Sequence, residues 1–223
     1  MSTENLDLLY RHRFSESELP AKNAIWKVLC RHFFQRYVDA DKDTVLDLAC
    51  GYGEFINNIK AKRKIAVDLN PDSPASLAPG IEFHATRANE LGPIPDGSVD
   101  VVFTSNFFEH LPSKTVLSEV LREVHRVLRP GGKLIAMGPN IRYLPGEYWD
   151  FIDHHLPLSE RSLAEALSIS GFEMVQVVDR FLPYTTQSRL PQAPWLVRAY
   201  LLMPISWRFL GKQFLVIARK TRH

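Results

Sequence analysis

Residues 45–56, VLDLACGYGEFI, constrain the fold of this chain more than any other stretch. The stretch opens with alternating and β-branched apolar residues, which are typical of a buried strand. It then turns through Gly51 and Gly53 into a segment that can continue as a helix. Glycine serves where the backbone needs a positive φ, or where a ligand must approach with no Cβ in the way. The helix that follows offers free N–H groups to an anionic ligand group. The sequence therefore predicts the first unit of a nucleotide-type α/β fold.

Two acids accompany this turn. Asp47 lies in the predicted strand, and Asp68 ends the next one, 21 residues later. That separation is one βα unit, so we expect the carboxylates at neighbouring strand tips, roughly 5 Å apart. Asp47 would repel a pyrophosphate, but it would attract a ligand with an ammonium group beside its carboxylate, such as S-adenosylmethionine (SAM). Asp68 can accept hydrogen bonds from ribose hydroxyls.

Four segments over residues 44–140 resemble a known family: LDLACGYGEF, AVDLNPDS, DGSVDVVFTSNFFEHL and VLREVHRVLRPGGKLIAMGPN. In this order and spacing they look like a class I SAM-dependent methyltransferase of the type 11 group. The flanking segments RHRF and DHHLPL resemble a subgroup found beside bacterial polysaccharide genes. The resemblance implies SAM as cofactor and a Rossmann-like α/β fold. That fold has a seven-stranded, mostly parallel sheet, helices on both faces, an antiparallel seventh strand, and here an α-helical cap near the C-terminus.

The expected cofactor-binding residues follow from the turn, the two acids and the resemblance. They are Asp47, Ala49, Gly51, Gly53, Asp68, Leu69, Asn70, Ala88, Asn89, Asn106, Phe107 and Arg13. Arg13 would pair with the SAM carboxylate; the alternative is an exposed arginine. The family's acid for the adenine amino group is absent, because Arg87 stands in its place. Adenine recognition is then left to Asn89, Glu90 or the backbone around Ala88.

Methyl transfer needs a base only if the acceptor loses a proton as it attacks. Candidates are His110, at the active edge, and His154 and His155 on the long loop 141–158, where Asp153 could orient an imidazole. For His110 the alternative is a packing role beneath that loop. A metal held by Glu147, Asp150, Asp153, His154 and His155 was also considered, and we expect none.

Composition narrows the class of acceptor. A net charge of +2 and the absence of a basic stripe argue against nucleic acid. The Asn-Pro-Pro-aromatic pattern of base methylation is missing at Asn106, and no cysteine nucleophile follows there. Two cysteines and an N-terminus unlike a signal peptide predict a cytoplasmic protein. We expect one domain over residues 1–223, with an N-terminal lid (1–40) and acceptor-side segments at 141–158 and 180–211.

These observations favour a SAM-dependent methyltransferase that methylates an oxygen of a small molecule, a sugar or a lipid-linked glycan, with a role in polysaccharide biosynthesis. Residues 190–211 mix tryptophan, aliphatic and basic side chains, which suits peripheral membrane contact. The alternatives for that segment are a helix packed on the domain and a homodimer contact. Two other functions stay open: a SAM-binding regulatory protein without turnover, and a nicotinamide-dependent oxidoreductase. The oxidoreductase is disfavoured by Asp47 and by the missing third glycine.

Overall fold

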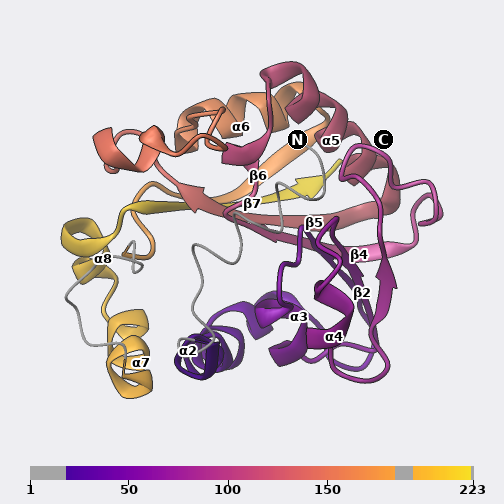
Figure 1. Cartoon of the computed structure of the whole chain (residues 1–223), viewed down its shortest axis with the longest axis horizontal. Helices are drawn as coiled ribbons and strands as arrows, with labels where there is room; N and C mark the ends of the chain where they lie inside the picture. Colours follow the sequence, from indigo (N-terminus) through magenta and orange to yellow (C-terminus); the bar gives the residue numbers. More distant parts are fainter. Residues whose placement is uncertain (1–18, 184–192, 222–223) are drawn as a thin grey trace. The chain divides into compact units, whose positions relative to one another are not determined.

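A computed structural model describes residues 19–183 and 193–221 of the chain (Figure 1). Its strands form a seven-stranded sheet in the order β3-β2-β1-β4-β5-β7-β6. The strands are β1 (Thr44–Leu48), β2 (Arg63–Val67), β3 (Glu82–His84), β4 (Val99–Ser105), β5 (Leu128–Pro139), β6 (Phe172–Val178) and β7 (Gln213–Lys220). By its contacts the chain divides into two compact units. The first unit comprises residues 1–87 and 191–202, and the second comprises residues 88–190 and 203–223.

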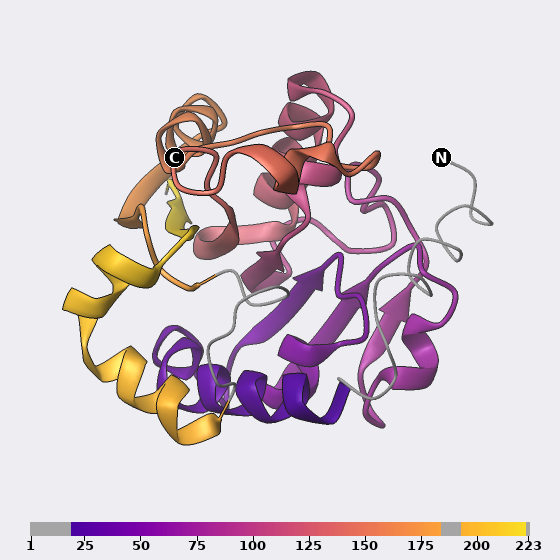
Figure 2. The same ribbon diagram turned by 60° about the vertical axis from the view of Figure 1, so that its left-hand side comes forward.

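The first unit is built on three parallel strands, in which β2 lies between β1 and β3. Its helices are α2 (Leu19–His32), η2 (Phe34–Tyr37), α3 (Glu54–Asn58), α4 (Ser73–Ser76) and α7 (Pro194–Leu202). Helix α2 packs against both α3 and α7, and Figure 2 shows α2 in indigo beside α7 in gold. Trp26, Phe34 and Phe55 form an aromatic cluster that joins α2, η2 and α3. The unit therefore buries apolar residues from all of these segments around β1 and β2.

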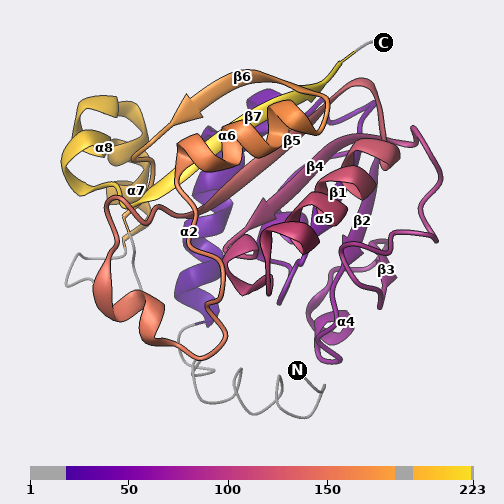
Figure 3. The same ribbon diagram turned by 90° about the horizontal axis from the view of Figure 1, so that it is seen from above.

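The second unit pairs β4 with β5 in parallel and places β7 antiparallel between β5 and β6. Its helices are η3 (Phe108–His110), α5 (Lys114–Val127), η4 (Gly146–Asp150), α6 (Glu160–Ile169) and α8 (Pro204–Leu210). Helices α5 and α6 lie on the same side of these strands (Figure 3). Ser113 caps α5 by accepting a hydrogen bond from the Val116 N–H, and Ser159 caps α6 in the same way.

The expected fold class is confirmed: the sheet is mostly parallel, β7 is antiparallel, and helices surround it. One boundary differs. The sequence predicts a helix through Leu128 that ends at Pro130, but α5 ends at Val127 and β5 begins at Leu128. A register irregularity between Val99 and Val101 accompanies the early start of β5. No helix among the described residues is both long and apolar enough to cross a bilayer.

Gly211, at the end of α8, gives a test of packing in the second unit. An added Cβ would lie 2.6 Å from the Arg180 carbonyl carbon and 2.6 Å from the Trp207 carbonyl oxygen. Neither backbone atom can move away cheaply, so Gly211→Ala is expected to destabilise the protein by about 1–3 kcal/mol. Gly92→Ala is the matched control, because nothing lies within 4 Å of its added Cβ. Chemical denaturation measures both variants, and equal stability for the two would contradict this packing.

Candidate active site

The turn after β1 has the conformation that its glycines predict. Gly51 and Gly53 have φ values of 54° and 75°, and Ala49 also has a positive φ, at 59°. A Cβ on Gly53 would lie 2.5 Å from Leu77 Cδ2, so the site of this glycine is also crowded. Among the described residues, Ala49 and Asn106 are the only non-glycine residues with positive φ. Such strain is concentrated at functional sites.

Asp68 holds this turn in place. Its Oδ2 atom accepts a hydrogen bond from the Gly51 N–H at 2.7 Å, and its Oδ1 atom accepts one from the Asn70 N–H at 2.8 Å. Burial raises the pKa of Asp68, although these N–H groups oppose the rise. Leu69, next to Asp68, has 43% of its surface exposed and can offer an apolar contact to a ligand. Asp68, Gly51, Leu69 and Asn70 are thus brought together as expected.

Asp47 lies deeper than the sequence suggests. The register of β1 and β2 pairs Asp47 with Ala66, two residues before Asp68, so the acids are offset by about 7 Å along the strands. The expectation of two carboxylates directly opposite each other was therefore wrong. Asp47 is 3% exposed, and burial, followed by the negative charge of Glu54, raises its pKa. A hydrogen bond from the Ile56 N–H opposes that rise and places Asp47 beneath the turn.

In the second unit, the residues after β4 form another strained turn. Asn106 has a φ of 50°, and its N–H donates to the Met137 carbonyl at 2.9 Å. Its side-chain oxygen accepts a hydrogen bond from Gln213 Nε2 at 3.2 Å. These two bonds link Asn106 to β5 and to β7. Asn106 is exposed, and Phe107, the next residue, is half-buried. The turn holds the two residues that were expected at the reacting end of the cofactor.

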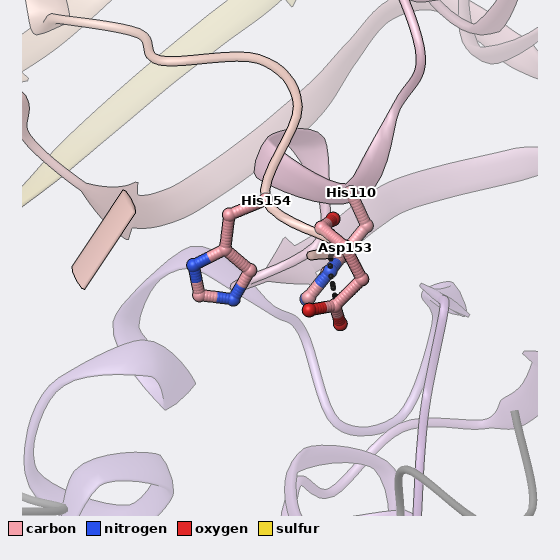
Figure 4. A group of neighbouring side chains, drawn as sticks. All are labelled: His110, Asp153 and His154. Atoms are coloured by element: carbon pink, nitrogen blue, oxygen red, sulfur yellow. Dashed lines mark hydrogen bonds and ion pairs between the residues drawn. The ribbon is translucent and has the colours of Figure 1, made fainter. Parts of the chain in front are cut away.

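His110, in η3, forms a pair with Asp153, which lies 43 residues later in the chain. The His110 Nδ1 atom lies 3.2 Å from Asp153 Oδ2 and 3.1 Å from the Asp153 carbonyl oxygen (Figure 4). Burial lowers the pKa of His110, but the hydrogen bond to Asp153 and the charges of Glu109 and Asp153 raise it more, so the net shift is upward. The pair therefore resembles the carboxylate-oriented imidazole of a general base.

His154 completes this cluster, and His155 does not. The His154 ring lies 4.9 Å from the His110 ring, centroid to centroid, and His154 Nδ1 lies 2.6 Å from the Tyr148 carbonyl oxygen. His110, Asp153 and His154 each offer a ligand-type atom within 4.8 Å of the others. His155 is exposed, and its backbone N–H donates to the Glu109 carbonyl at 2.8 Å. Glu147 and Asp150 are not part of the three-residue group.

Glu109 anchors the long loop 141–158 to η3. Its carbonyl accepts hydrogen bonds from the His155 and Leu156 N–H groups, and its carboxylate accepts one from the Tyr148 hydroxyl at 2.8 Å. Glu109 is 2% exposed, and burial raises its pKa. Sequence reasoning missed this residue. The Glu-His pair in the sequence was a signal, but only the path of the loop shows that Glu109 fixes the loop while His110 meets Asp153.

The residues expected to recognise adenine lie after β3, around Ala88 and Asn89. Asn89 Nδ2 donates to Glu119 Oε2 at 2.9 Å, which ties Asn89 to α5, and Ala88 beside it is half-buried. Arg87 is exposed, so the missing acid is not replaced at that position. Arg13 lies outside the described residues.

Residues 46–136 match the family described as "Methyltransferase domain". A probable S-adenosylmethionine-dependent methyltransferase of Mycolicibacterium smegmatis is 33% identical over 144 residues, which are 61% of this chain and 54% of the relative. The 27-O-demethylrifamycin SV methyltransferase of Amycolatopsis mediterranei is 33% identical over 108 residues, 43% of this chain and 38% of that protein. The chain spans about half the length of the first of these relatives.

The fold agrees with this similarity. A SAM-dependent methyltransferase from Archaeoglobus fulgidus superposes with a TM-score of 0.66 at 21% identity, over 96% of this chain and 99% of that one. The seven-stranded sheet with its antiparallel β7 is therefore a Rossmann-like fold that is shared with solved SAM-dependent methyltransferases. Residues 46–136 thus carry a similarity to the methyltransferase family, and the first relative is named as dependent on S-adenosylmethionine.

Asp68→Asn tests the cofactor site. One carboxylate oxygen becomes an amide nitrogen, so either a bond to the turn or a bond to a ribose hydroxyl is lost, and SAM affinity is expected to fall about 10- to 100-fold. Asp72→Asn is the control, because Asp72 is exposed and lies four residues away on the same segment. Titration calorimetry measures both. Equal affinity of wild type and Asp68→Asn would remove Asp68 from the site.

Proposed function

We propose that this chain transfers the methyl group of SAM to a hydroxyl oxygen, with His110 as general base and Asp153 as the residue that orients it. The observation that carries the proposal is the hydrogen bond between His110 Nδ1 and Asp153. His110 follows β4 and Asp153 lies on the loop after β5, and these two strands are parallel, so the pair lies beyond their carboxyl ends, where open α/β sheets bind their ligands.

The donor-side residues fit the cofactor. Gly51 leaves the backbone of the turn open to the methionine end of SAM, because its added Cβ would meet only Glu54 Oε2 at 4.0 Å, and Asp68 would accept hydrogen bonds from the ribose hydroxyls. Asp47 beneath the turn would add negative potential for the ammonium group when it is ionised. Bound SAM supplies an electrophilic methyl group on a positively charged sulfur. The chain's task is then to align the acceptor and exclude water.

His110 would take the proton of the acceptor hydroxyl. Because Nδ1–H donates to Asp153, the neutral imidazole has its lone pair on Nε2. Nε2 would hold the proton that the hydroxyl loses as it receives the methyl group from the sulfur of SAM. His110 would give this proton to solvent once the methylated acceptor and S-adenosylhomocysteine have left. Asp153 stabilises the imidazolium that forms in between.

The class of acceptor rests on chemistry and on relatives. A general base assists the methylation of a hydroxyl, because the hydroxyl must lose its proton. One relative carries a name that refers to methylation at an oxygen. We therefore propose a hydroxyl of a small molecule, a sugar or a lipid-linked glycan, the last two in keeping with the polysaccharide-type flanking motifs. We still expect no metal at this site, although His110, Asp153 and His154 lie close enough together to hold one.

Asp153→Asn tests the electrostatics of the base without any acceptor. Removing the carboxylate removes the charge that raises the pKa of His110, so that pKa is expected to fall. NMR titration of the imidazole measures it. Activity requires the deprotonated base, so the wild-type rate should fall as the pH drops through the His110 pKa, and in Asp153→Asn this decline should move to lower pH. An unchanged His110 pKa would contradict the pairing.

Incubation of methyl-labelled SAM with polar, sugar-nucleotide and lipid fractions of cell extract tests the activity. Wild type should label one fraction at oxygen, His110→Ala should label it at least about 100-fold more slowly, and His155→Ala should label it as wild type does. Chelating agents should leave the rate unchanged. SAM binding with no labelled fraction would favour the regulatory alternative, and equal rates for wild type and His110→Ala would remove the base.

A further inference from the structure

The end of the chain has an unusual charge. Residues 180–223 contain eight lysines and arginines and no aspartate or glutamate, although the whole chain has a net charge of only +2. Arg198 in α7, Arg208 in α8 and Lys212 just after α8 are all exposed. Basic residues of this density attract anionic surfaces.

The same segment exposes large apolar side chains. Half of the exposed large apolar residues in the described part of the chain lie between positions 195 and 210. They are Trp195 (69% exposed), Leu202 (73%), Met203 (51%), Ile205 (64%), Phe209 (75%) and Leu210 (43%). A concentration of this kind marks an interaction surface.

In each helix the exposed residues share one face. Trp195, Arg198 and Leu202 are spaced by three and four residues in α7, and Ile205, Arg208 and Phe209 are spaced by three and one in the shorter α8, so that positions 205, 208 and 209 lie together. We call these two sets the apolar-basic faces. Each combines two large apolar side chains with one arginine.

Neither face is needed to hold its helix. Helix α8 packs through Trp207, which is 8% exposed and meets the Phe181 ring edge-on at 5.0 Å. Arg180 fixes the end of α8 by donating to the Phe209 and Gly211 carbonyls, each at 3.0 Å. Helix α7 buries Leu201 and packs on α2. The outward apolar side chains therefore add nothing to the packing of their own helices.

We propose that each apolar-basic face, that of α7 in the first unit and that of α8 in the second, docks on an anionic lipid surface. Tryptophan, bulky aliphatic residues and arginine are the side chains that sit at the boundary between headgroups and acyl chains. A second copy of this chain fits less well, because a symmetric contact would bring two acid-free, basic segments together. The helices lie on the surface, since none of the described helices is able to span it. This docking is independent of methyl transfer.

Co-sedimentation with phosphatidylcholine vesicles, with and without phosphatidylglycerol, tests the proposal. Wild type should sediment with the phosphatidylglycerol vesicles, and the Trp195 fluorescence should shift to the blue. Ile205→Ser/Phe209→Ser should bind these vesicles at least about tenfold more weakly, because two membrane-facing apolar side chains are lost. Ile169→Ser/Val175→Ser is the matched control, since these residues are 82% and 51% exposed elsewhere in the second unit. It should bind as wild type does.

Thermal melts of both double variants confirm that each is folded. Three results would overturn the proposal: no sedimentation of wild type with either vesicle, equal binding of Ile205→Ser/Phe209→Ser and wild type, or equal binding with and without phosphatidylglycerol. A dimer that gel filtration finds in wild type but not in Ile205→Ser/Phe209→Ser, without vesicle binding, would assign the surface to a second copy instead.

Discussion

The carboxylate of Asp68 is the interaction on which the candidate cofactor site depends. It accepts hydrogen bonds from the N–H groups of Gly51 and Asn70, so it joins the turn after β1 to the turn after β2. Each carboxylate oxygen keeps a further lone pair for a ligand. A single side chain can thus shape the turn and still have lone pairs for the ribose hydroxyls of the proposed cofactor.

The catalytic proposal depends on a second constraint, the attachment of loop 141–158 to η3. Glu109 accepts two backbone N–H groups from this loop and a hydroxyl from Tyr148. These bonds hold Asp153 against His110, in a part of the chain where the backbone has no regular structure of its own. Removing water from the Glu109 carboxylate has a free-energy cost, which the hydrogen bond from the Tyr148 hydroxyl partly offsets.

The strand and turn at residues 45–56 could be predicted because their signal is local. Strand β1 (Thr44–Leu48) covers the start of this stretch, and Gly51 and Gly53 have the expected positive φ. The prediction that the helix ends at Pro130 was wrong, because Pro130 lies within β5. A proline-glycine pair after residues with helical spacing usually marks a turn, and it does not do so here. The positive φ of Ala49 and Asn106 had no signal, since neither residue type requires it.

The pairing of His110 with Asp153 could not be predicted for a different reason. The two residues are 43 positions apart, and Asp153 lies on the loop 141–158, which has no sequence period from which its path could be derived. The sequence marked His110, His154 and His155 as equal candidates, and only the fold separates them. By contrast, the sequence alone shows that no acidic residue follows Asp179. Only the structure shows that Ile205 and Phe209 are exposed, which is needed to infer an interaction surface there.

A crystal structure with S-adenosylhomocysteine tests the account most directly. We expect the ribose hydroxyls within hydrogen-bond distance of the Asp68 carboxylate, and the amino-acid end of the ligand against the backbone of Gly51 and Gly53. A ligand bound elsewhere on the chain, or one whose ribose makes no contact with Asp68, would contradict it.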